Sequence, residues 1–159
     1  MKFSTQEEYG LRCLLQIARR GAGASCTIPE IAKAEGLSPT HVAKILMLLR
    51  REGFVKSTRG QAGGYLLGCD PATTTVGSVL EAMGGKLYDG AFCVRHRGAL
   101  DVCTHDVDCG VRSLWKRVQI AIDSVVDRIT LADMLADGAL ESTKSNVVFH
   151  AAGRPRPVA

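Results

Sequence analysis

Apolar residues recur at helical spacing in three segments of the first 53 residues, which predicts three helices. Residues 6–20 repeat leucine at helical spacing and close on two arginines and a glycine. Residues 27–36 open on a threonine cap with a proline in the first turn, and residues 38–53 open on a serine cap with the same proline signal. Each of these two segments ends at a glycine, so together they predict a helix-turn-helix.

A β-hairpin is predicted immediately after the helix-turn-helix. Residues 54–58 and 65–67 have the composition of strands, and a glycine-rich tip at 59–64 separates them. A hairpin in this position is a wing. Because glycines place no side chain in the way, the tip can bring Arg59 close to a nucleic-acid backbone.

The second half of the chain begins with a short predicted helix over 75–85 and continues into an irregular stretch over 86–110. From Val111 a long helix is predicted, in which apolar residues recur at alternating intervals of four and three. This spacing is that of a coiled-coil seam, and we expect a dimer interface in preference to packing on the chain's own core. The seam residues are Val111, Trp115, Val118, Ile122, Val125 and Ile129.

The fold class that these elements predict is mainly α with a small β-hairpin wing, a winged helix-turn-helix followed by a long dimerisation helix. A last short helix starts at Thr130, and the polar end of the chain predicts a disordered tail. The resulting division is a DNA-binding region over 1–83, a cysteine-rich loop over 84–110, the dimerisation helix and short helix over 111–136, and the tail over 137–159.

Composition indicates a globular protein with unevenly distributed charge. Of the 159 residues, 46% are hydrophobic and 23% are charged, and no apolar run is long enough to cross a bilayer. With no signal peptide at its start, the chain is predicted to be cytoplasmic. Residues 1–68 carry ten Lys or Arg against five Asp or Glu, whereas residues 69–159 carry ten against eleven. The basic first half favours a polyanionic partner.

A winged helix-turn-helix places its second helix in the major groove and its wing along the backbone or the minor groove. Hydroxyl groups can bond to base edges there, and a lysine can reach a guanine or a phosphate. Winged helices also serve as protein-interaction modules, but the basic half, the seam and the wing arginine together favour double-stranded DNA. A twofold dimer then predicts a pseudo-palindromic operator. The residues predicted to contact DNA are Ser38, Thr40, His41, Lys44, Arg59 and Gln61.

Three of the six cysteines, Cys93, Cys103 and Cys109, lie within seventeen residues in the irregular stretch. Thiolates are soft ligands that select iron–sulfur clusters, zinc or Cu(I), and the polar surroundings argue against simple burial. Spacing alone leaves these metals open, together with the alternative that the thiols are reduced and bind nothing. Cytosolic thiols are kept reduced, which disfavours structural disulfides.

Several segments carry a resemblance to a known family. The most specific are STRGQAGGYLL at 57–67 and CGVRSLW at 109–115; the others are MKFS at 1–4 with YGL at 9–11, IPEIA at 28–32 and TLADML at 130–135. Over residues 1–136 the chain resembles the winged-helix iron–sulfur transcription regulators that include IscR, NsrR and RirA.

The resemblance implies a homodimer that docks through its long helix, and a 2Fe–2S or 4Fe–4S cluster on the three cysteines. It also implies that DNA binding depends on the state of the cluster. By position, Arg59 matches the wing arginine of the family, and Ser38 and Thr40 match its recognition-helix contacts.

The chain departs from the family pattern at three places. Nine residues separate Cys93 from Cys103, more than in the better-known members. Arg112 stands where some members have a histidine ligand, and an arginine cannot take that role. Ala43 stands where some members have an acidic residue used in specificity, so we expect a different operator.

The fourth cluster ligand is therefore open. Other members use an acidic residue of the first helix, contributed by the partner subunit, and Glu8 occupies that position. A carboxylate binds iron more weakly than a thiolate, so the site would be labile and suited to sensing. We prefer Glu8, with His105 as the alternative because imidazole also suits iron. Position 12, a histidine in one redox-sensing type, is Arg12 here.

The leading hypothesis is a transcription regulator, a repressor, whose operator binding is controlled by an iron–sulfur cluster that senses redox, nitric oxide or iron status. The alternative is a winged-helix regulator without a cluster, acting by cysteine thiol oxidation or through a protein partner. An enzyme is disfavoured, because the sequence shows no nucleophile elbow, phosphate-binding loop or zinc-protease helix.

Overall fold

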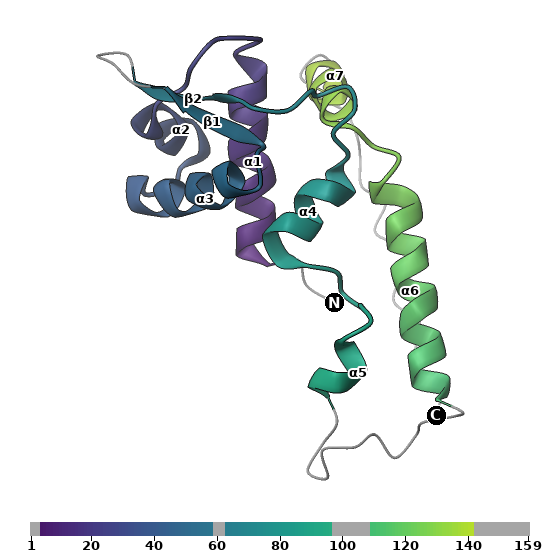
Figure 1. Cartoon of the computed structure of the whole chain (residues 1–159). Coiled ribbons are helices and arrows are strands. Elements are labelled where there is room, and N and C mark those ends of the chain that lie inside the picture. The colour runs from purple at the N-terminus through teal and green to yellow at the C-terminus, as the bar shows by residue number, and fades with distance from the viewer. Residues whose placement is uncertain (1–3, 59–62, 97–108, 142–159) are drawn as a thin grey trace, which may run out of the picture.

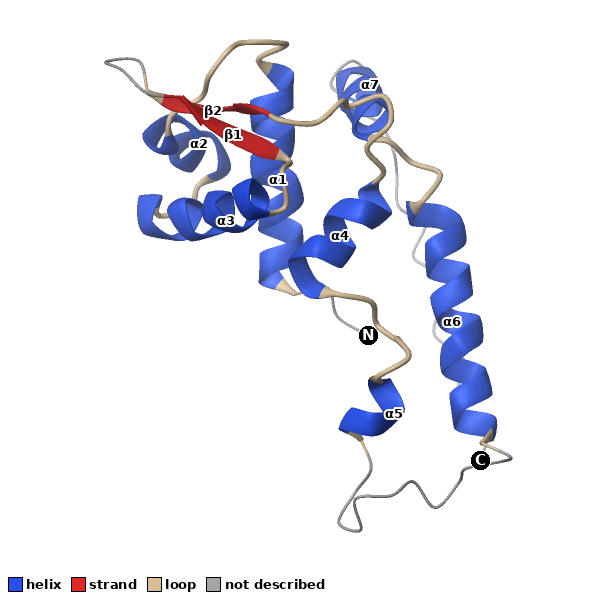
Figure 2. Ribbon diagram, in the orientation of Figure 1, coloured by secondary structure: helices blue, strands red, loops and turns tan. Residues whose placement is uncertain are grey.

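The computed structural model describes residues 4–58, 63–96 and 109–141, and these ranges form seven helices and one two-stranded antiparallel sheet (Figures 1 and 2). The predicted fold class, mainly α with a small hairpin wing, is confirmed. The elements in chain order are α1 (Thr5–Arg19), α2 (Ile28–Glu35), α3 (Pro39–Arg51), β1 (Val55–Thr58), β2 (Gly64–Leu67), α4 (Val76–Gly84), α5 (Phe92–Arg95), α6 (Gly110–Val126) and α7 (Leu131–Glu141).

The helix starts that the sequence predicts are present as side-chain caps. Thr27 accepts a hydrogen bond from the backbone of Glu30, whose carboxylate accepts in return from the Thr27 backbone N–H at 2.8 Å. The Ser38 and Thr75 side chains cap α3 and α4 by accepting from the backbone N–H groups of His41 and Ser78. Each cap satisfies an otherwise unpaired N–H of the first turn, which fixes where the helix begins.

The core of the N-terminal unit lies between α1, α2, α3 and β1. Leucines and isoleucines at helical spacing on α1 and α3 are fully buried there, because each helix turns one apolar stripe inward. In the hairpin, the core residue Val55 of β1 pairs with Leu67 of β2. A backbone bridge between Cys26 and Tyr65, with bonds of 2.8 and 2.9 Å, fastens β2 to the segment ahead of α2.

Helices α4 and α7 close the other side of the unit. Gly10 on α1 lies directly against Met83 of α4, where a Cβ atom would come within 2.6 Å of the Met83 Cε. Leu131, the first residue of α7, is fully buried in the common core. Its backbone N–H donates to the carbonyl of Thr74 at 3.0 Å. Helix α7 is therefore anchored to the N-terminal unit.

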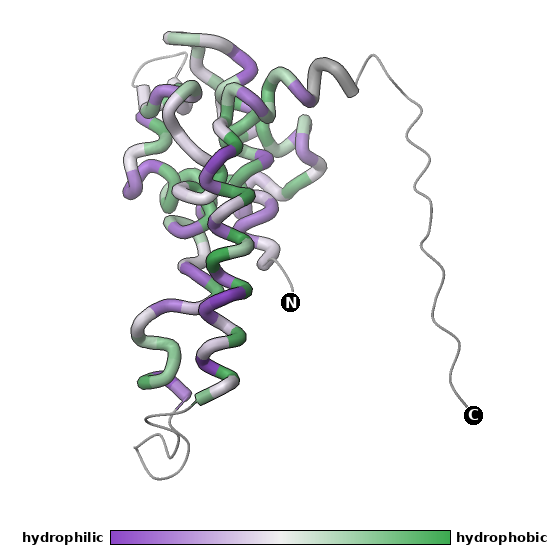
Figure 3. Tube along the Cα trace, turned by 90° about the vertical axis from the view of Figure 1, so that its right-hand side faces the viewer, coloured by the Kyte–Doolittle hydropathy of each residue, from purple (hydrophilic) through white to green (hydrophobic). Residues whose placement is uncertain are grey.

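Helix α6 stands apart from the three N-terminal helices and runs beside α4 and α5, as the views in Figures 1 and 3 show. Its C-terminal end touches α4 at Gly77, where the Val126 Cγ2 would lie 3.1 Å from an added Cβ. None of the helices in the described ranges is long and apolar enough to cross a membrane.

The structure differs from the sequence-based expectation at three places. Helix α6 ends at Val126, so Ile129 does not continue the predicted seam; its carbonyl instead accepts a hydrogen bond from the Val76 N–H at 2.8 Å. Helix α7 runs to Glu141, past the expected boundary at residue 136. The short helix α5 lies in the stretch predicted to be irregular.

Candidate functional site

The outer face of α3 is the candidate nucleic-acid interface. Val42, Ile45 and Leu49 point into the core, which leaves the opposite stripe to solvent. Thr40 and Lys44, both predicted to contact DNA, lie on that exposed stripe. One and two turns further on, the same stripe carries Met47, which is 57% exposed, and Arg51. Sequence reasoning missed these two, although extending the helical period from Thr40 would have found them.

The other two predicted residues of α3 are engaged within the chain. The Ser38 hydroxyl accepts a hydrogen bond from the His41 backbone N–H at 3.2 Å and so caps the helix. The His41 ring packs edge-on against Tyr9 of α1, with centroids 5.4 Å apart, and is half-buried. The structure nevertheless brings all four predicted residues together around a surface hollow of about 310 Å³ beside α1.

The wing is present as predicted, but Arg59 and Gln61 lie outside the described residues. At the base of the tip, the Gly64 N–H donates to the Thr58 hydroxyl at 3.0 Å, which closes the hairpin. A Cβ on Gly64 would stand 2.8 Å from the carbonyl oxygen of Cys26, so the bridge between the wing and the α2 segment requires glycine here. Lys56, on strand β1 of the wing, is an exposed cation.

Two of the three clustered cysteines are described, and both contact Arg112 in the first turn of α6. Cys109 is the N-cap of α6, and its Sγ accepts a hydrogen bond from the Arg112 backbone N–H at 3.3 Å. Cys93 lies on α5, where its Sγ is 3.8 Å from the Tyr88 hydroxyl. The guanidinium of Arg112 hydrogen-bonds to the Cys93 sulfur, and this contact raises the pKa of Arg112. Both thiols are half-buried.

Of the remaining predicted ligands, only Glu8 lies within the described residues. Cys103 and His105 lie outside the described residues. Glu8 is exposed on the first turn of α1. Within 4–58, 63–96 and 109–141, the His, Cys, Asp and Glu side chains form no group of three that could hold a metal ion. Arg12, one turn after Glu8, is tied to the Glu35 carboxylate at 2.7 Å and to its carbonyl at 2.9 Å.

Two further cysteines are part of the core. Cys13 is fully buried, and desolvation raises the pKa of its thiol to about 12. Cys26 is 3% exposed, and burial raises its pKa as well. Because the thiolate is the reactive and metal-binding form, neither residue is suited to a sensing role in the folded chain.

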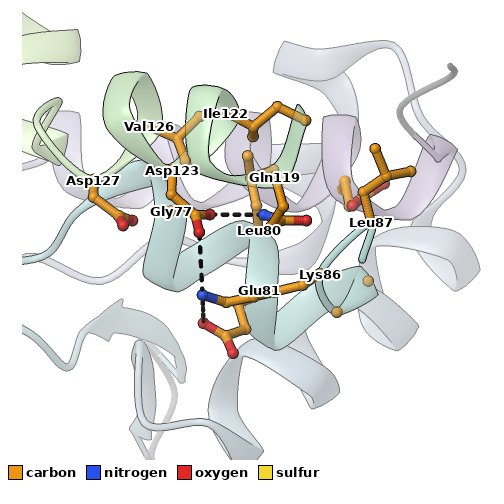
Figure 4. A pocket seen from close by; sticks show the side chains of 13 residues that line it. Gly77, Leu80, Glu81, Lys86, Leu87, Gln119, Ile122, Asp123, Val126 and Asp127 are labelled. Atoms are coloured by element: carbon orange, nitrogen blue, oxygen red, sulfur yellow. Dashed lines mark hydrogen bonds and ion pairs between the residues drawn. The ribbon is translucent and has the colours of Figure 1, made fainter. Parts of the chain in front are cut away.

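A polar network connects the cysteine segment to α6 and α4. The Tyr88 backbone N–H donates to the Gln119 Oε1 at 2.9 Å, and the Gln119 Nε2 donates to the Asp123 Oδ1 at 2.7 Å. The Lys86 ammonium lies 3.6 Å from Asp123 and 3.8 Å from Glu81 on α4. Figure 4 shows these side chains along one wall of a cavity of about 330 Å³ between α4 and α6.

The predicted seam of α6 is only partly turned outward. Val111 and Val125 are 62% and 57% exposed, and Val118 is half-buried. Ile122 lines the cavity next to α4 and so faces partly toward its own chain. Leu114, which the predicted seam omitted, is 54% exposed and lies on the same face as Val111. The apolar face open to solvent is therefore rotated toward Leu114.

Comparison with known proteins decides the family. The Rrf2 family model, described as an iron-dependent transcriptional regulator, matches residues 3–137. The chain belongs to the Rrf2 family. It is therefore a winged-helix, DNA-binding transcriptional regulator, and its relatives are regulators of transcription rather than enzymes.

Rrf2-family relatives match along nearly the whole chain. The HTH-type transcriptional regulator CymR of Bacillus subtilis is 31% identical over 144 residues, which cover 89% of this chain and 96% of that protein. IscR of Aliivibrio salmonicida is 27% identical over 149 residues, covering 92% and 86%. The solved structure of T. potens IscR superposes with a TM-score of 0.70 at 30% identity and covers 92% of this chain and 94% of that one.

The structure of B. subtilis CymR, described as the global cysteine regulator of that organism, also gives a TM-score of 0.70. It is 28% identical to this Rrf2-family chain and covers 86% of it and 98% of its own length.

Proposed function

We propose that this Rrf2-family regulator is a cytoplasmic, homodimeric repressor whose binding to a pseudo-palindromic operator is controlled by an iron–sulfur cluster, 2Fe–2S or 4Fe–4S. The proposed ligands are Cys93, Cys103, Cys109 and Glu8, with His105 as the alternative to Glu8. The observation that carries the proposal is that Cys93 and Cys109, from separate segments, both bond to one residue at the start of α6.

The donors present suit such a cluster. Thiolate sulfur is the soft ligand that iron–sulfur clusters require, and both described sulfurs are half-buried, so they are reachable without unfolding the core. Cys109 also stands at the N-terminus of α6, where the helix dipole favours an anionic ligand. A bound cluster supplies a centre whose stability and potential respond to its ligands and surroundings.

The position of the site supports control over α6. Tyr88 contacts the Cys93 sulfur with its hydroxyl, while its backbone donates to Gln119 on α6. A rearrangement at Cys93 therefore acts on α6 directly. The exposed apolar face around Val111 and Leu114 is the surface that we propose a second copy of the chain covers, as the seam pattern predicts.

The cluster is tested by anaerobic purification followed by visible absorption and by iron, sulfide and zinc analysis. We expect iron and acid-labile sulfide in near-equal amounts and thiolate-to-iron absorption. In Glu8→Ala the cluster should be lost faster in air than in wild type, whereas Glu52→Ala, at the end of α3, should match wild type. A colourless protein that also resists reconstitution would refute the proposal, and loss in His105→Ala with an unaffected Glu8→Ala would move the fourth ligand to His105.

DNA binding is tested with a duplex selected from a random library by the wild-type holoprotein. Lys44→Ala should weaken binding and lower the slope of log affinity against log salt by about one. Arg128→Ala, an exposed cation in the turn after α6, serves as the matched loss of one charge. Equal losses in the two variants would show that α3 does not face the DNA.

A second candidate function rests on the similarity to CymR of B. subtilis, whose structure is described as that of a cysteine regulator. In that case this chain would act without a cluster, by thiol oxidation or through a protein partner. The same purification separates the two candidates. Protein that carries no iron yet changes its affinity for DNA on reversible thiol oxidation would favour the second.

A further inference from the structure

Arg112 occupies a position from which one residue reaches two of the proposed cluster ligands. It is the third residue of α6, so its backbone N–H is the group that donates a hydrogen bond to the side chain of the N-cap residue. Here the cap is a sulfur, Cys109, at 3.3 Å. The geometry of the helix start therefore fixes where the Cys109 sulfur points.

The Arg112 side chain is directed to the other segment. Its guanidinium hydrogen-bonds to the Cys93 sulfur on α5, and Tyr88 approaches the same sulfur with its hydroxyl at 3.8 Å. Arg112 is half-buried. A planar guanidinium with five donors can hold such a geometry, whereas a lysine ammonium gives a point charge on a flexible stem.

Cations outnumber carboxylates around the Cys93 sulfur. Cys93 and Arg112 line a hollow of about 630 Å³ together with Lys86, Lys116, Asp89 and Asp123, and Lys86 lies 3.6 Å from Asp123. Asp89, which also lines it, is already paired with Arg95 through two hydrogen bonds of 2.8 and 3.0 Å. Positive charge next to the sulfurs is thus only partly offset by acidic neighbours.

We propose that Arg112 is a positioning residue of the cysteine site: it joins Cys93 to Cys109 and, through hydrogen bonds and charge at the two sulfurs, raises the reduction potential of the cluster. This inference rests on the proposed function. Hydrogen bonds to ligand sulfurs and positive charge both favour the reduced, more negative state of a cluster. Arg112 then acts at the site through the sulfurs, without coordinating iron.

The test measures the reduction potential of the cluster in wild type, Arg112→Gln and Arg112→Lys by spectroscopic redox titration under exclusion of air. In Arg112→Gln we expect the reduced-to-oxidised ratio at a fixed ambient potential to fall about tenfold, which corresponds to about 59 mV for a one-electron couple. The reduced-to-oxidised ratio of Arg112→Lys should lie between those of Arg112→Gln and wild type, because lysine keeps the positive charge and loses the planar guanidinium group. Arg117→Gln removes the same charge from α6 at a residue that does not line the hollow, and should match wild type.

The outcomes separate this inference from the proposed function. Wild-type protein that never contains iron and sulfide overturns both. Wild-type protein with a cluster, together with Arg112→Gln at equal iron content and unchanged potential, overturns the role of Arg112 alone. If Arg112→Gln loses the cluster while Arg112→Lys keeps it at a lowered potential, the inference is supported, because a merely structural side chain would not move the potential of an intact cluster.

Discussion

The backbone N–H of Tyr88 donates to the side-chain oxygen of Gln119 at 2.9 Å and so attaches the segment before Cys93 to α6. Gln119 is buried, with 8% of its surface exposed. Its amide nitrogen donates onward to Asp123. A buried amide that satisfies both of its ends specifies one position of the segment against the helix.

Replacing that amide should be costly. In Gln119→Leu the Tyr88 N–H loses its acceptor and the Asp123 carboxylate keeps only its ion pair with Lys86, and we expect the free energy of unfolding in urea to fall by about 1–3 kcal/mol. Arg117→Ala, on the exposed side of α6, should stay within about 0.5 kcal/mol of wild type. Equal values for the two variants would mean that Tyr88 is held to α6 by other contacts.

Gly77 should tolerate no side chain. A Cβ there would meet the carboxylate of the exposed Asp127, which would have to rotate away, and would stand 3.1 Å from the Val126 Cγ2, so Gly77→Ala requires the end of α6 to shift slightly. We expect a loss of about 1–3 kcal/mol in unfolding free energy. Gly90→Ala, with nothing within 4 Å of its added Cβ, is the matched control. If Gly77→Ala and Gly90→Ala have the same unfolding free energy, the contact between α4 and α6 does not contribute to stability.

The cysteines should react in two groups. Burial raises the pKa of Cys13 to about 12, and Cys26 is buried too, whereas Cys69, Cys93 and Cys109 are half-buried. Because the thiolate is the nucleophile, iodoacetamide should label the second group of the folded apoprotein well before the first. Peptide mapping by mass spectrometry reads the order, and denaturant should abolish the difference. Early labelling of Cys13 would show that α1 separates from the core and exposes this thiol.

Asp133 should make the stability of α7 depend on acidity. Its carboxylate accepts from the Thr130 hydroxyl at 2.7 Å and the Thr130 N–H at 2.9 Å, and these bonds hold its pKa below the ordinary value of 3.8. A pKa lowered in the folded state adds stability above the unfolded-state value, and that stability is lost as pH falls through the folded-state pKa.

The unfolding free energies of wild type and Asp133→Asn should therefore differ most at about pH 6 and converge toward about pH 2. Asp137→Asn, at an exposed position of the same helix, is the control for the loss of one negative charge. A gap between wild type and Asp133→Asn that stays constant with pH would contradict a role for the ionised carboxylate.

Local signals in the sequence gave the fold, and long-range contacts account for what it missed. The caps at Thr27, Ser38 and Thr75 act within three residues, so the pattern predicts their helices correctly. The heptad spacing continues through Ile129, but α6 ends at Val126, and the bridge between Thr75 and Thr130 returns the chain to the start of α4.

The candidate site divides in the same way. The exposure of Thr40 and Lys44 follows from helical period alone. The packing of His41 on Tyr9 joins helices that are distant in sequence, as does the bond of Arg112 to Cys93, and no local pattern encodes either contact. Helix α5 has four residues and no side-chain cap, so it offered no signal to find.

The two ends of α6 are held by unlike attachments. Just after its C-terminal end the chain forms backbone bonds with Thr74 and with Val76, the first residue of α4, and continues into the buried Leu131. Toward the other end the described contacts are side-chain bonds: Arg112 bonds to Cys93, and Gln119, near the middle of the helix, bonds to Tyr88. A helix of 17 residues is roughly 25 Å long, so a pivot of about 5° at the fixed end sweeps the cysteine end by about 2 Å. A small rotation of α6 about its C-terminal end, which is attached to the N-terminal unit, would therefore become a larger displacement at the cysteine end.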